Sequence, residues 1–176
     1  MLKTILLVIG GAIVVSLGVI LVLAALKPDR FRVERSVTID APPEKILPLI
    51  DDYRAWTRWS PYEFDPAMKR SYSGAETGKG SIYEWDGKDT GSGRMEMLEA
   101  SPSHVLIKLD FFKPFKANNM AAFTLTPQGA ATKVTWSMEG PLTFLSKIMH
   151  IVINMDRMIG GQFDEGLAKL KALAEG

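Results

Sequence analysis

An apolar segment near the N-terminus constrains this chain more than any other feature. Residues 5–26 contain no charged side chain and consist of aliphatic residues, alanine, glycine and one serine. As a helix rising about 1.5 Å per residue, the segment is roughly 33 Å long, enough to cross a hydrocarbon core of about 30 Å. We therefore expect residues 1–26 to form a transmembrane anchor with a short N-terminal tail.

Two alternatives exist for this segment. A cleavable signal peptide has an apolar core of only about 7 to 15 residues, followed by a small-residue cleavage site. Residues 22–24 resemble such a site, but the apolar run before them is longer, and Lys3 is the only charged residue ahead of it. A helix in a soluble core would show a polar face over this length. The pattern favours a retained anchor.

The charges that flank the segment predict its orientation. Lys3 lies on one side, whereas Lys27, Arg30, Arg32 and Arg35 follow on the other. The positive-inside tendency then places the C-terminal part of the chain in the cytoplasm. The same basic residues also belong to the folded domain, so the opposite orientation stays open. We expect a single-pass membrane protein with a cytoplasmic domain.

The composition of the remaining chain is that of one globular domain. The 176 residues carry a net charge of +1, with 23% charged and 47% hydrophobic residues. After the anchor we expect a short linker at 27–30 and a single domain at 31–176. The near-neutral charge gives no electrostatic footprint for nucleic acid. The absence of cysteine excludes disulfides and thiolate chemistry, and the oligomeric state stays open.

The domain opens with a strand and two short helices. Apolar and polar residues alternate over 31–39, which predicts a half-buried strand. Residues 40–44 carry helix-starting chemistry, with prolines in the first turn, and predict a helix that turns Ile46, Leu47 and Ile50 inward. A second short helix is expected at 52–56, ending before the Trp-Ser-Pro sequence at 59–61.

Six further strands are expected, separated by turns rich in glycine, proline and serine. They cover 68–73, 81–85, 94–99, 104–112, 120–126 and 131–139. Such closely spaced strands pair antiparallel, because a parallel crossover needs a dozen or more residues. Alternation predicts one apolar face made by Tyr83, Trp85, Met95, Met97, Val105, Ile107, Leu109, Phe111, Phe123, Leu125, Val134, Trp136 and Met138. Lys108, Asp110, Lys133, Thr135, Ser137 and Glu139 should face water.

The chain closes with a segment of helical periodicity. Apolar residues recur at this spacing at Leu145, Ile148, Val152, Met155, Ile159, Phe163, Leu167 and Leu170. They predict one long helix over 142–173 that lies across the apolar face of the sheet. Gly160 and Gly161 permit a kink near its middle. The first half is apolar on more than one side, and a ligand, the short helices or the bilayer could cover that excess.

The order of these elements and several short motifs carry a resemblance. The motifs are Ala41-Pro42-Pro43, Trp56 with Trp59-Ser60-Pro61, Asp65-Pro66, Gly78-Lys79-Gly80 with Tyr83-Glu84-Trp85, Gly91-Ser92-Gly93 with Met95, Phe112-Lys113-Pro114-Phe115, Thr132-Lys133-Val134-Thr135-Trp136 and Met155-Asp156. With these features the chain resembles the START-like (SRPBCC) superfamily, in particular its polyketide cyclase/dehydrase and lipid transport branch. The resemblance implies an α+β helix-grip fold, with a seven-stranded antiparallel sheet wrapped around a long C-terminal helix.

The resemblance also implies a deep cavity between the sheet and the long helix, holding a lipid or another apolar small molecule. The residues expected to bind this ligand are Trp56, Trp59, Tyr83, Trp85, Met95, Met97, Phe111, Phe123, Trp136, Met138, Met149, Val152, Met155 and Asp156. These side chains suit a filled core equally well, although methionine in quantity favours an adaptable apolar site. Trp56 and Trp59 are expected near the mouth of the cavity or in the membrane interface.

Asp156 is an ionisable residue at an expected apolar position. At about 100° per residue it falls inside the helix stripe that faces the sheet. Parity places Arg35 on the inner face of the first strand. Because an unpaired buried carboxylate is strongly unfavourable, we expect Asp156 to pair with Arg35, to be protonated, or to border water in the cavity. In the last case it would anchor a ligand head group or transfer a proton.

The remaining chemical groups argue against most catalytic mechanisms. The two histidines, His104 beside a turn and His150 opposite the helix stripe, are expected on the surface. The sequence supplies no Ser-His-acid set and no metal-ligand spacing, so we expect no catalytic residue, metal or cofactor. The leading interpretation is a membrane-anchored binding module for a lipid or other apolar small molecule. The alternatives are a cyclase/dehydrase-type or hydrolytic enzyme that uses Asp156 with Tyr83, and an interaction domain with a filled core.

Overall fold

The computed structural model describes residues 2–152 and 154–176. The chain divides into two compact units, which we describe separately. The first combines Met1–Phe31 with Pro141–Met155, and the second combines Arg32–Gly140 with Asp156–Gly176.

The first unit contains helix α1, Leu2–Leu26. Within it, Ile9–Leu26 is long and apolar enough to cross a membrane, and almost none of that stretch is buried by protein. The expected apolar helix is therefore confirmed. A signal sequence near an N-terminus passes the same test of length and composition, so both interpretations of the segment remain.

Helix α3, Phe144–Val152, belongs to the same unit and packs against α1, where Ala24 is fully buried. The side chain of Lys147 is also buried, and its Nζ lies 2.6 Å from Oδ1 of Asp29. That ammonium group holds the pKa of the Asp29 carboxyl below its ordinary value, by hydrogen bonding and by charge. This contact fastens the segment that follows α1 to α3.

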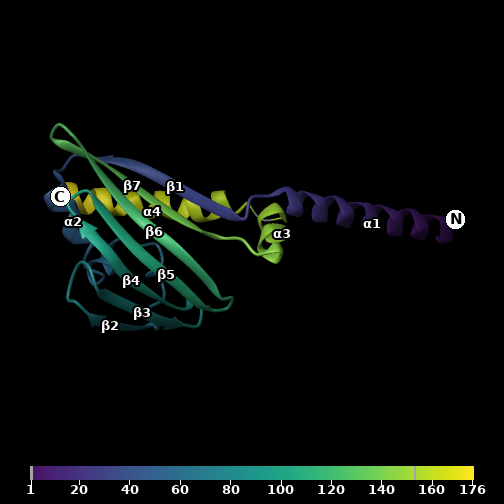
Figure 1. Cartoon of the computed structure of the whole chain (residues 1–176), viewed down its shortest axis with the longest axis horizontal. Helices are drawn as coiled ribbons and strands as arrows, with labels where there is room; N and C mark the ends of the chain where they lie inside the picture. Colours follow the sequence, from purple (N-terminus) through teal and green to yellow (C-terminus); the bar gives the residue numbers. More distant parts are fainter. Residues whose placement is uncertain (1, 153) are drawn as a thin grey trace. The chain divides into compact units, whose positions relative to one another are not determined.

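The second unit is built on a seven-stranded antiparallel sheet with the order β1-β7-β6-β5-β4-β3-β2, as the sequence predicts. The strands are β1 Arg30–Ile39, β2 Lys69–Gly74, β3 Ser81–Gly87, β4 Gly91–Ser101, β5 His104–Lys113, β6 Ala117–Gln128 and β7 Ala131–Pro141. The first strand of the chain therefore lies beside the last one (Figure 1). The strands from β2 to β7 follow one another as a meander.

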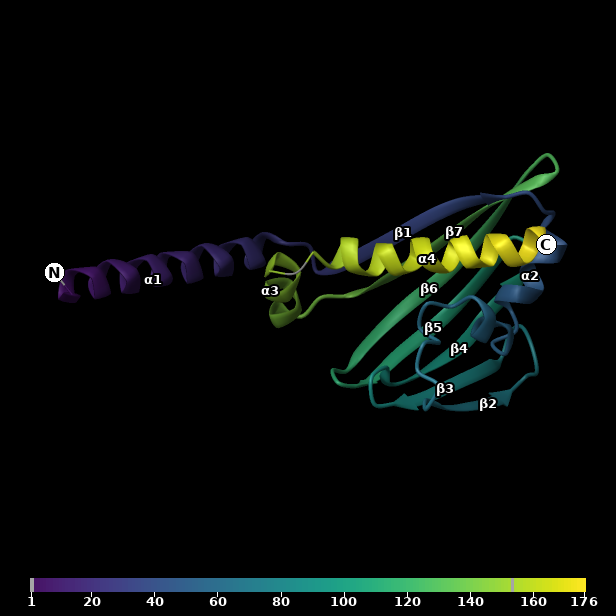
Figure 2. The same cartoon turned by 180° about the vertical axis from the view of Figure 1, so that it is seen from behind.

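Three helical segments complete the second unit. They are α2 Pro43–Ile50, the short 3-10 helix η1 Ala55–Arg58, and α4 Met155–Glu175. Helix α4 crosses one face of the sheet, and α2 lies near its C-terminal end (Figure 2). The apolar stripe of α4 is buried there through Ile159, Phe163, Leu167 and Leu170. We call the face of the sheet that α4 covers the inner face.

The single long helix predicted over 142–173 is wrong, because α3 ends at Val152 and α4 begins at Met155. Asn154 directly precedes the first residue of α4, the position where asparagine is favoured as a helix cap. Asparagine is also unfavourable inside a helix, so it disfavours one continuous helix through this position. Gly160 and Gly161, which the sequence suggested as a kink, lie inside α4. The apolar spacing continues across the break, so periodicity alone could not reveal it.

The alternation of inner and outer residues along the strands is confirmed, with one correction. Asp110 and Ser137 lie on the outer face, but each is only 7% exposed, so the expectation that they face water is wrong. Neighbouring side chains cover Asp110: Asn118 donates to its Oδ1 at 2.6 Å, and Nζ of Lys108 lies 3.0 Å from its Oδ2. An antiparallel neighbour can thus bury a polar residue on a solvated face.

Candidate functional site

The inner face of the sheet is closed at one end. There Phe123 of β6 pairs with Val105 of β5 and with Trp136 of β7. The three side chains are 0%, 0% and 3% exposed. The rings of Trp136 and Phe123 are stacked with centroids 5.0 Å apart, and the Trp59 ring meets Trp136 edge-on at 5.6 Å. We call Val105, Phe123 and Trp136 the closed end.

The opposite end of the inner face is less covered. Met95, Leu109 and Asn119 pair across β4, β5 and β6 and are 7%, 8% and 7% exposed. One row further out, Trp85 and Phe111 flank Gly93 and are only half-buried. Burial therefore decreases steadily along the inner face. We call Trp85, Met95, Leu109, Phe111 and Asn119 the open end.

Gly93 shapes the open end. A Cβ atom at this position would overlap the indole ring of Trp85, so the absence of a side chain lets that ring lie across the strand. The Trp85 ring then meets the ring of Phe111 edge-on, with centroids 5.8 Å apart. The two aromatic rings form an apolar rim beside the residues of the open end.

The structure corrects the expected positions of Trp56 and Trp59. They are 3% and 1% exposed, so neither lies at a mouth nor is available to a membrane interface. Their indole N–H groups donate to the carbonyl oxygens of Ile50 and Leu49, each at 2.8 Å. Those carbonyls belong to the last turn of α2, where helix carbonyls lack a partner within the helix. The short helix η1 thus turns both indoles into the core.

Two polar atoms are buried beside these rings with no hydrogen-bond partner in the described part of the chain: Oη of Tyr53 and Nε1 of Trp136. Tyr53 is 2% exposed, and its ring lies 5.5 Å from Trp56 and 5.9 Å from Tyr83. Burial raises the pKa of the Tyr53 hydroxyl, so the group stays protonated and can donate. An unsatisfied buried donor costs about 1–3 kcal/mol, so an added acceptor would be stabilising.

A buried polar cluster that the sequence analysis missed lies next to Tyr83. Glu63, whose side chain is 5% exposed, accepts from the Tyr83 hydroxyl at 2.6 Å and from Nε of Arg70 at 2.7 Å. Burial and this hydrogen bond raise the pKa of Tyr83, which keeps its hydroxyl protonated. Glu63 lies in an irregular segment between η1 and β2, where no periodicity marks which side chains turn inward.

Asp156 pairs with Arg35, which is one of the alternatives that the sequence left open. Oδ2 of Asp156 lies 3.1 Å from the Arg35 guanidinium, and Asp164 approaches the same group at 3.4 Å. The Asp156 side chain is 63% exposed, so its expected place in the buried stripe is wrong. It lies in the first turn of α4, before the buried part of the helix begins at Ile159. The enzyme alternative requires Asp156 to act together with Tyr83. In the structure Asp156 pairs with Arg35, whereas Tyr83 donates to Glu63, so the two residues have separate partners.

The other residues expected to bind ligand are divided between the units. Met97 and Met138 are 0% and 8% exposed on the inner face. Met149 and Met155 belong to the unit formed with α1, where Met149 is 38% exposed. The side chain of Val152, like that of His150, lies outside the described residues. Ligand binding by these residues stays a prediction.

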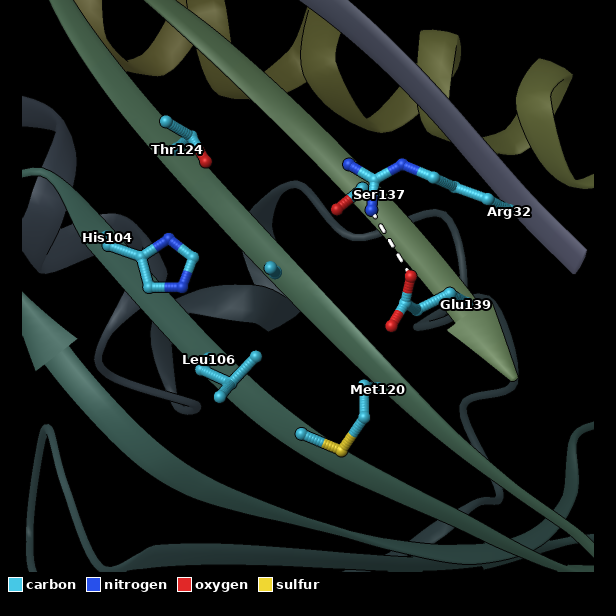
Figure 3. A pocket seen from close by; sticks show the side chains of 8 residues that line it. Arg32, His104, Leu106, Met120, Thr124, Ser137 and Glu139 are labelled. Carbon is cyan, nitrogen blue, oxygen red and sulfur yellow. Dashed lines mark hydrogen bonds and ion pairs between the residues drawn. The ribbon is translucent and has the colours of Figure 1, made fainter. Parts of the chain in front are cut away.

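Over residues 2–152 and 154–176 the structure contains two small pockets, and no inner-face residue of the sheet lines either of them. One of about 210 Å³ lies on the outer face (Figure 3). Its lining comes from β1, β5, β6 and β7 and includes His104, Met120 and the ion pair between Arg32 and Glu139, 3.4 Å long. The other, of about 190 Å³, lies between α4 and the segment around η1. Both are below the roughly 300–1,000 Å³ typical of ligand pockets.

Comparison with known proteins places this architecture in a family. A family model described as "Polyketide cyclase / dehydrase and lipid transport" matches residues 30–175. The chain belongs to this family. The match spans the sheet, η1, α2 and α4, and the fold of this polyketide cyclase/dehydrase family suggests a ligand-binding cavity. A search of curated proteins found no match.

Several solved structures share this fold. Protein CV1439 from Chromobacterium violaceum is similar with 18% identity and a TM-score of 0.59, covering 85% of this chain and 99% of its own. The Aha1 dimer from Colwellia psychrerythraea has 15% identity and a TM-score of 0.60, covering 82% and 96%. Protein MLL2253 from Mesorhizobium loti has 20% identity and a TM-score of 0.58, covering 81% and 96%. At such identities these similarities establish the helix-grip fold alone.

Proposed function

We propose that this member of the polyketide cyclase/dehydrase family is a membrane-anchored binding module for a lipid or another apolar small molecule. The ligand enters between the sheet and α4 at the open end. The observation that carries this proposal is the gradient of burial along the inner face, from 0% exposure at Phe123 to 8% at Leu109 and a half-buried Phe111. Such a gradient is expected of an apolar face that receives a partner at one end.

The unpaired donor of Tyr53, whose ring lies 5.9 Å from that of Tyr83, supports a ligand that is apolar but carries at least one acceptor, such as a carbonyl or hydroxyl oxygen. Apolar ligand sites commonly contain a few polar groups of this kind, which fix the orientation of the ligand. The acceptor of the ligand would supply the hydrogen bond that the protein alone does not make. A saturated hydrocarbon without oxygen should therefore bind more weakly than its alcohol or ketone.

Room for the ligand comes from side chains that can move. Met97 and Met138 lie along the inner face between the closed and open ends, and Met95 belongs to the open end. Methionine side chains are unbranched and adapt to irregular spaces, so they can yield without disturbing the strands. The stacked rings of the closed end remain in place, and the ligand occupies the half of the inner face that leads to Trp85 and Phe111.

The anchor keeps this site beside lipid. Helix α1 ends at Leu26 and β1 begins at Arg30, so the linking chain spans at most about 13 Å. We place the domain in the cytoplasm, because the basic residues follow the helix. Because the chain has no cysteine, a Ser103→Cys variant carries one reactive thiol on an exposed turn. A membrane-impermeant maleimide should label it only after cells are permeabilised; labelling of intact cells would reverse the orientation.

Binding is tested with the full chain, purified in detergent and delipidated. It is offered labelled phospholipids, fatty acids and isoprenoids, and saturable uptake of about one molecule per chain is expected for one class, detected by native mass spectrometry. Leu109→Trp, which fills the open end, should weaken uptake about tenfold, from the roughly 1–3 kcal/mol cost of overpacking. Leu106→Trp, on the outer face of the same strand, is the matched control. Failure of every apolar class to saturate would overturn the proposal.

A further inference from the structure

The hairpin between β5 and β6 carries an unusual group of exposed side chains. In residues 32–140 and 156–176, five large apolar side chains are exposed: Phe64, Leu98, Phe112, Phe115 and Met158. Two of them, Phe112 and Phe115, lie in this one hairpin and are 47% and 72% exposed. Lys113 and Lys116 beside them are also exposed. We call residues 112–116 the aromatic hairpin.

The aromatic hairpin adjoins the open end of the inner face. Phe111 and Ala117, which pair with each other, are the residues on its two sides. Phe111 contacts the Trp85 ring and is itself part of the open end. The turn between β3 and β4 lies alongside, because Ser92 pairs with Lys113. A surface that covers the aromatic hairpin would therefore also cover the entrance to the proposed site.

The same end of the sheet receives the chain from α1. Arg32, near the start of β1, forms an ion pair with Glu139 of β7, and Glu139 pairs with Met120 of β6. The beginning of β1 and the aromatic hairpin thus lie at one end of the sheet (Figure 2). The turn between β6 and β7 lies at the opposite end. The short link to α1 keeps the end with the hairpin within reach of lipid.

We propose that the aromatic hairpin docks on an anionic phospholipid surface, with Phe112 and Phe115 among the head groups and both lysines on lipid phosphates. The inference rests on the proposed function and names the route by which the ligand enters. Aromatic rings flanked by lysine suit the interface, where the rings leave water and the ammonium groups remain hydrated. Asp86 approaches Nζ of Lys113 at 3.9 Å, but the Lys113 side chain is 69% exposed and remains accessible.

The other exposed apolar residues of this unit do not form a comparable surface. Phe64, Leu98 and Met158 lie on different segments and are exposed singly, which is normal for a soluble surface. Docking through the aromatic hairpin therefore selects one orientation of the domain. In that orientation the open end meets lipid, and an apolar ligand passes into the protein without crossing water.

The test uses the absence of cysteine in the natural chain. Phe115→Cys and Ala130→Cys each introduce one thiol, the first in the aromatic hairpin and the second in the β6–β7 turn at the opposite end of the sheet. Both full-length variants are labelled with an environment-sensitive fluorophore. They are reconstituted into vesicles of phosphatidylcholine alone or mixed with phosphatidylglycerol. Lipids carrying a nitroxide quencher then report which label touches the bilayer.

The label at position 115 should shift its emission to shorter wavelength and be quenched in the anionic vesicles, whereas the label at 130 should behave as in water. Lys113→Glu and Lys116→Glu should each lower the ratio of docked to undocked domain about fivefold. Equal quenching at both positions, or no quenching at 115, would overturn the inference. If the label at 115 is quenched equally in vesicles with and without phosphatidylglycerol, the proposed preference for anionic lipid is wrong.

A parallel uptake measurement in detergent separates this inference from the proposed function. Normal ligand uptake without quenching at position 115 rejects the docking surface and leaves the binding module intact. Quenching without uptake supports the docking surface and rejects the ligand. Because Phe115 and Ala130 are exposed, neither substitution should alter the circular dichroism spectrum.

Discussion

The indole of Trp136 on β7 lies flat against the phenyl ring of Phe163 on α4, with centroids 4.1 Å apart and 9° between the ring planes. Gly166 makes room for this contact, because a Cβ there would lie 2.9 Å from the Trp136 ring. The stacked pair joins the closing helix to the sheet at the closed end. This contact between α4 and the sheet therefore lies away from the proposed entrance.

Removing the ring of Phe163 should destabilise the fold strongly. Phe163→Ala should lower the free energy of unfolding by about 3–5 kcal/mol, because it leaves a cavity against Trp136. Denaturant titration of the full chain in detergent measures the change. Met158→Ala on the same helix, where the side chain is 50% exposed, should change it by less than about 1 kcal/mol. Equal effects of the two substitutions would show that the stack does not hold α4.

Gly160 should resist substitution because the Arg35 guanidinium occupies the place of its side chain. Alanine favours a helix over glycine by about 1 kcal/mol, so Gly161→Ala, with open space around it, should stabilise α4. Gly160→Ala should lose that advantage by displacing Arg35 from Asp156 and Asp164. In an Arg35→Ala background the two alanine substitutions should give the same melting temperature. A difference that persists there would exclude Arg35 as the cause.

The Tyr83 hydroxyl should contribute to stability through Glu63. Tyr83→Phe removes a donor from a carboxylate that is 5% exposed, and we expect a loss of about 1–3 kcal/mol in unfolding free energy. Tyr72→Phe, on the partly exposed neighbouring strand, should cost less than about 0.5 kcal/mol. Glu63→Gln should remove most of the penalty of Tyr83→Phe, since the side chain that loses the tyrosine donor is then no longer a buried carboxylate. If Tyr83→Phe is equally destabilising in the Glu63→Gln background, its effect does not arise from the hydrogen bond to Glu63.

Asp110 should make stability depend on pH in the acid range. Burial alone would raise its pKa, but hydrogen bonds from Asn118 and Lys108 hold the pKa below its ordinary value. A lowered pKa in the folded state gives a stabilisation that is present above about pH 4, the unfolded value, and is lost as pH falls through the folded pKa. The stability difference between the natural chain and Asp110→Asn should therefore shrink in this window. If the difference in unfolding free energy between the two proteins is constant from pH 7 to pH 2, the lowered pKa of Asp110 is contradicted.

The sheet was predictable because period-two alternation is a local signal. Tyr83 and Trp85, or Val134 and Trp136, reveal the buried face of their strands without knowledge of the neighbours. Tight turns then fix the pairing of successive strands, so the order from β2 to β7 follows from chain length alone. The pairing of Arg35 with Asp156 was among the expected alternatives because an ionisable residue near an apolar stripe requires a partner.

The remaining features depend on packing between distant segments. The indoles of Trp56 and Trp59 turn inward because carbonyls at the end of α2 accept their N–H groups, which no local pattern encodes. Glu63 accepts from Tyr83 although it lies in an irregular segment, and no local pattern encodes this contact either. The break between α3 and α4 is marked in the sequence only by Asn154, whose preference for a capping position was outweighed by the apolar spacing around it.

The pairing of β1 with β7 also governs when the domain can be completed during synthesis. The first strand leaves the ribosome directly after the apolar helix, yet its neighbour in the sheet is the last strand to be made. Residues 40–130 must emerge before the two can meet, and contacts between such distant segments form slowly. An unpaired strand edge therefore persists through most of translation, a state in which edges are prone to pair with other chains.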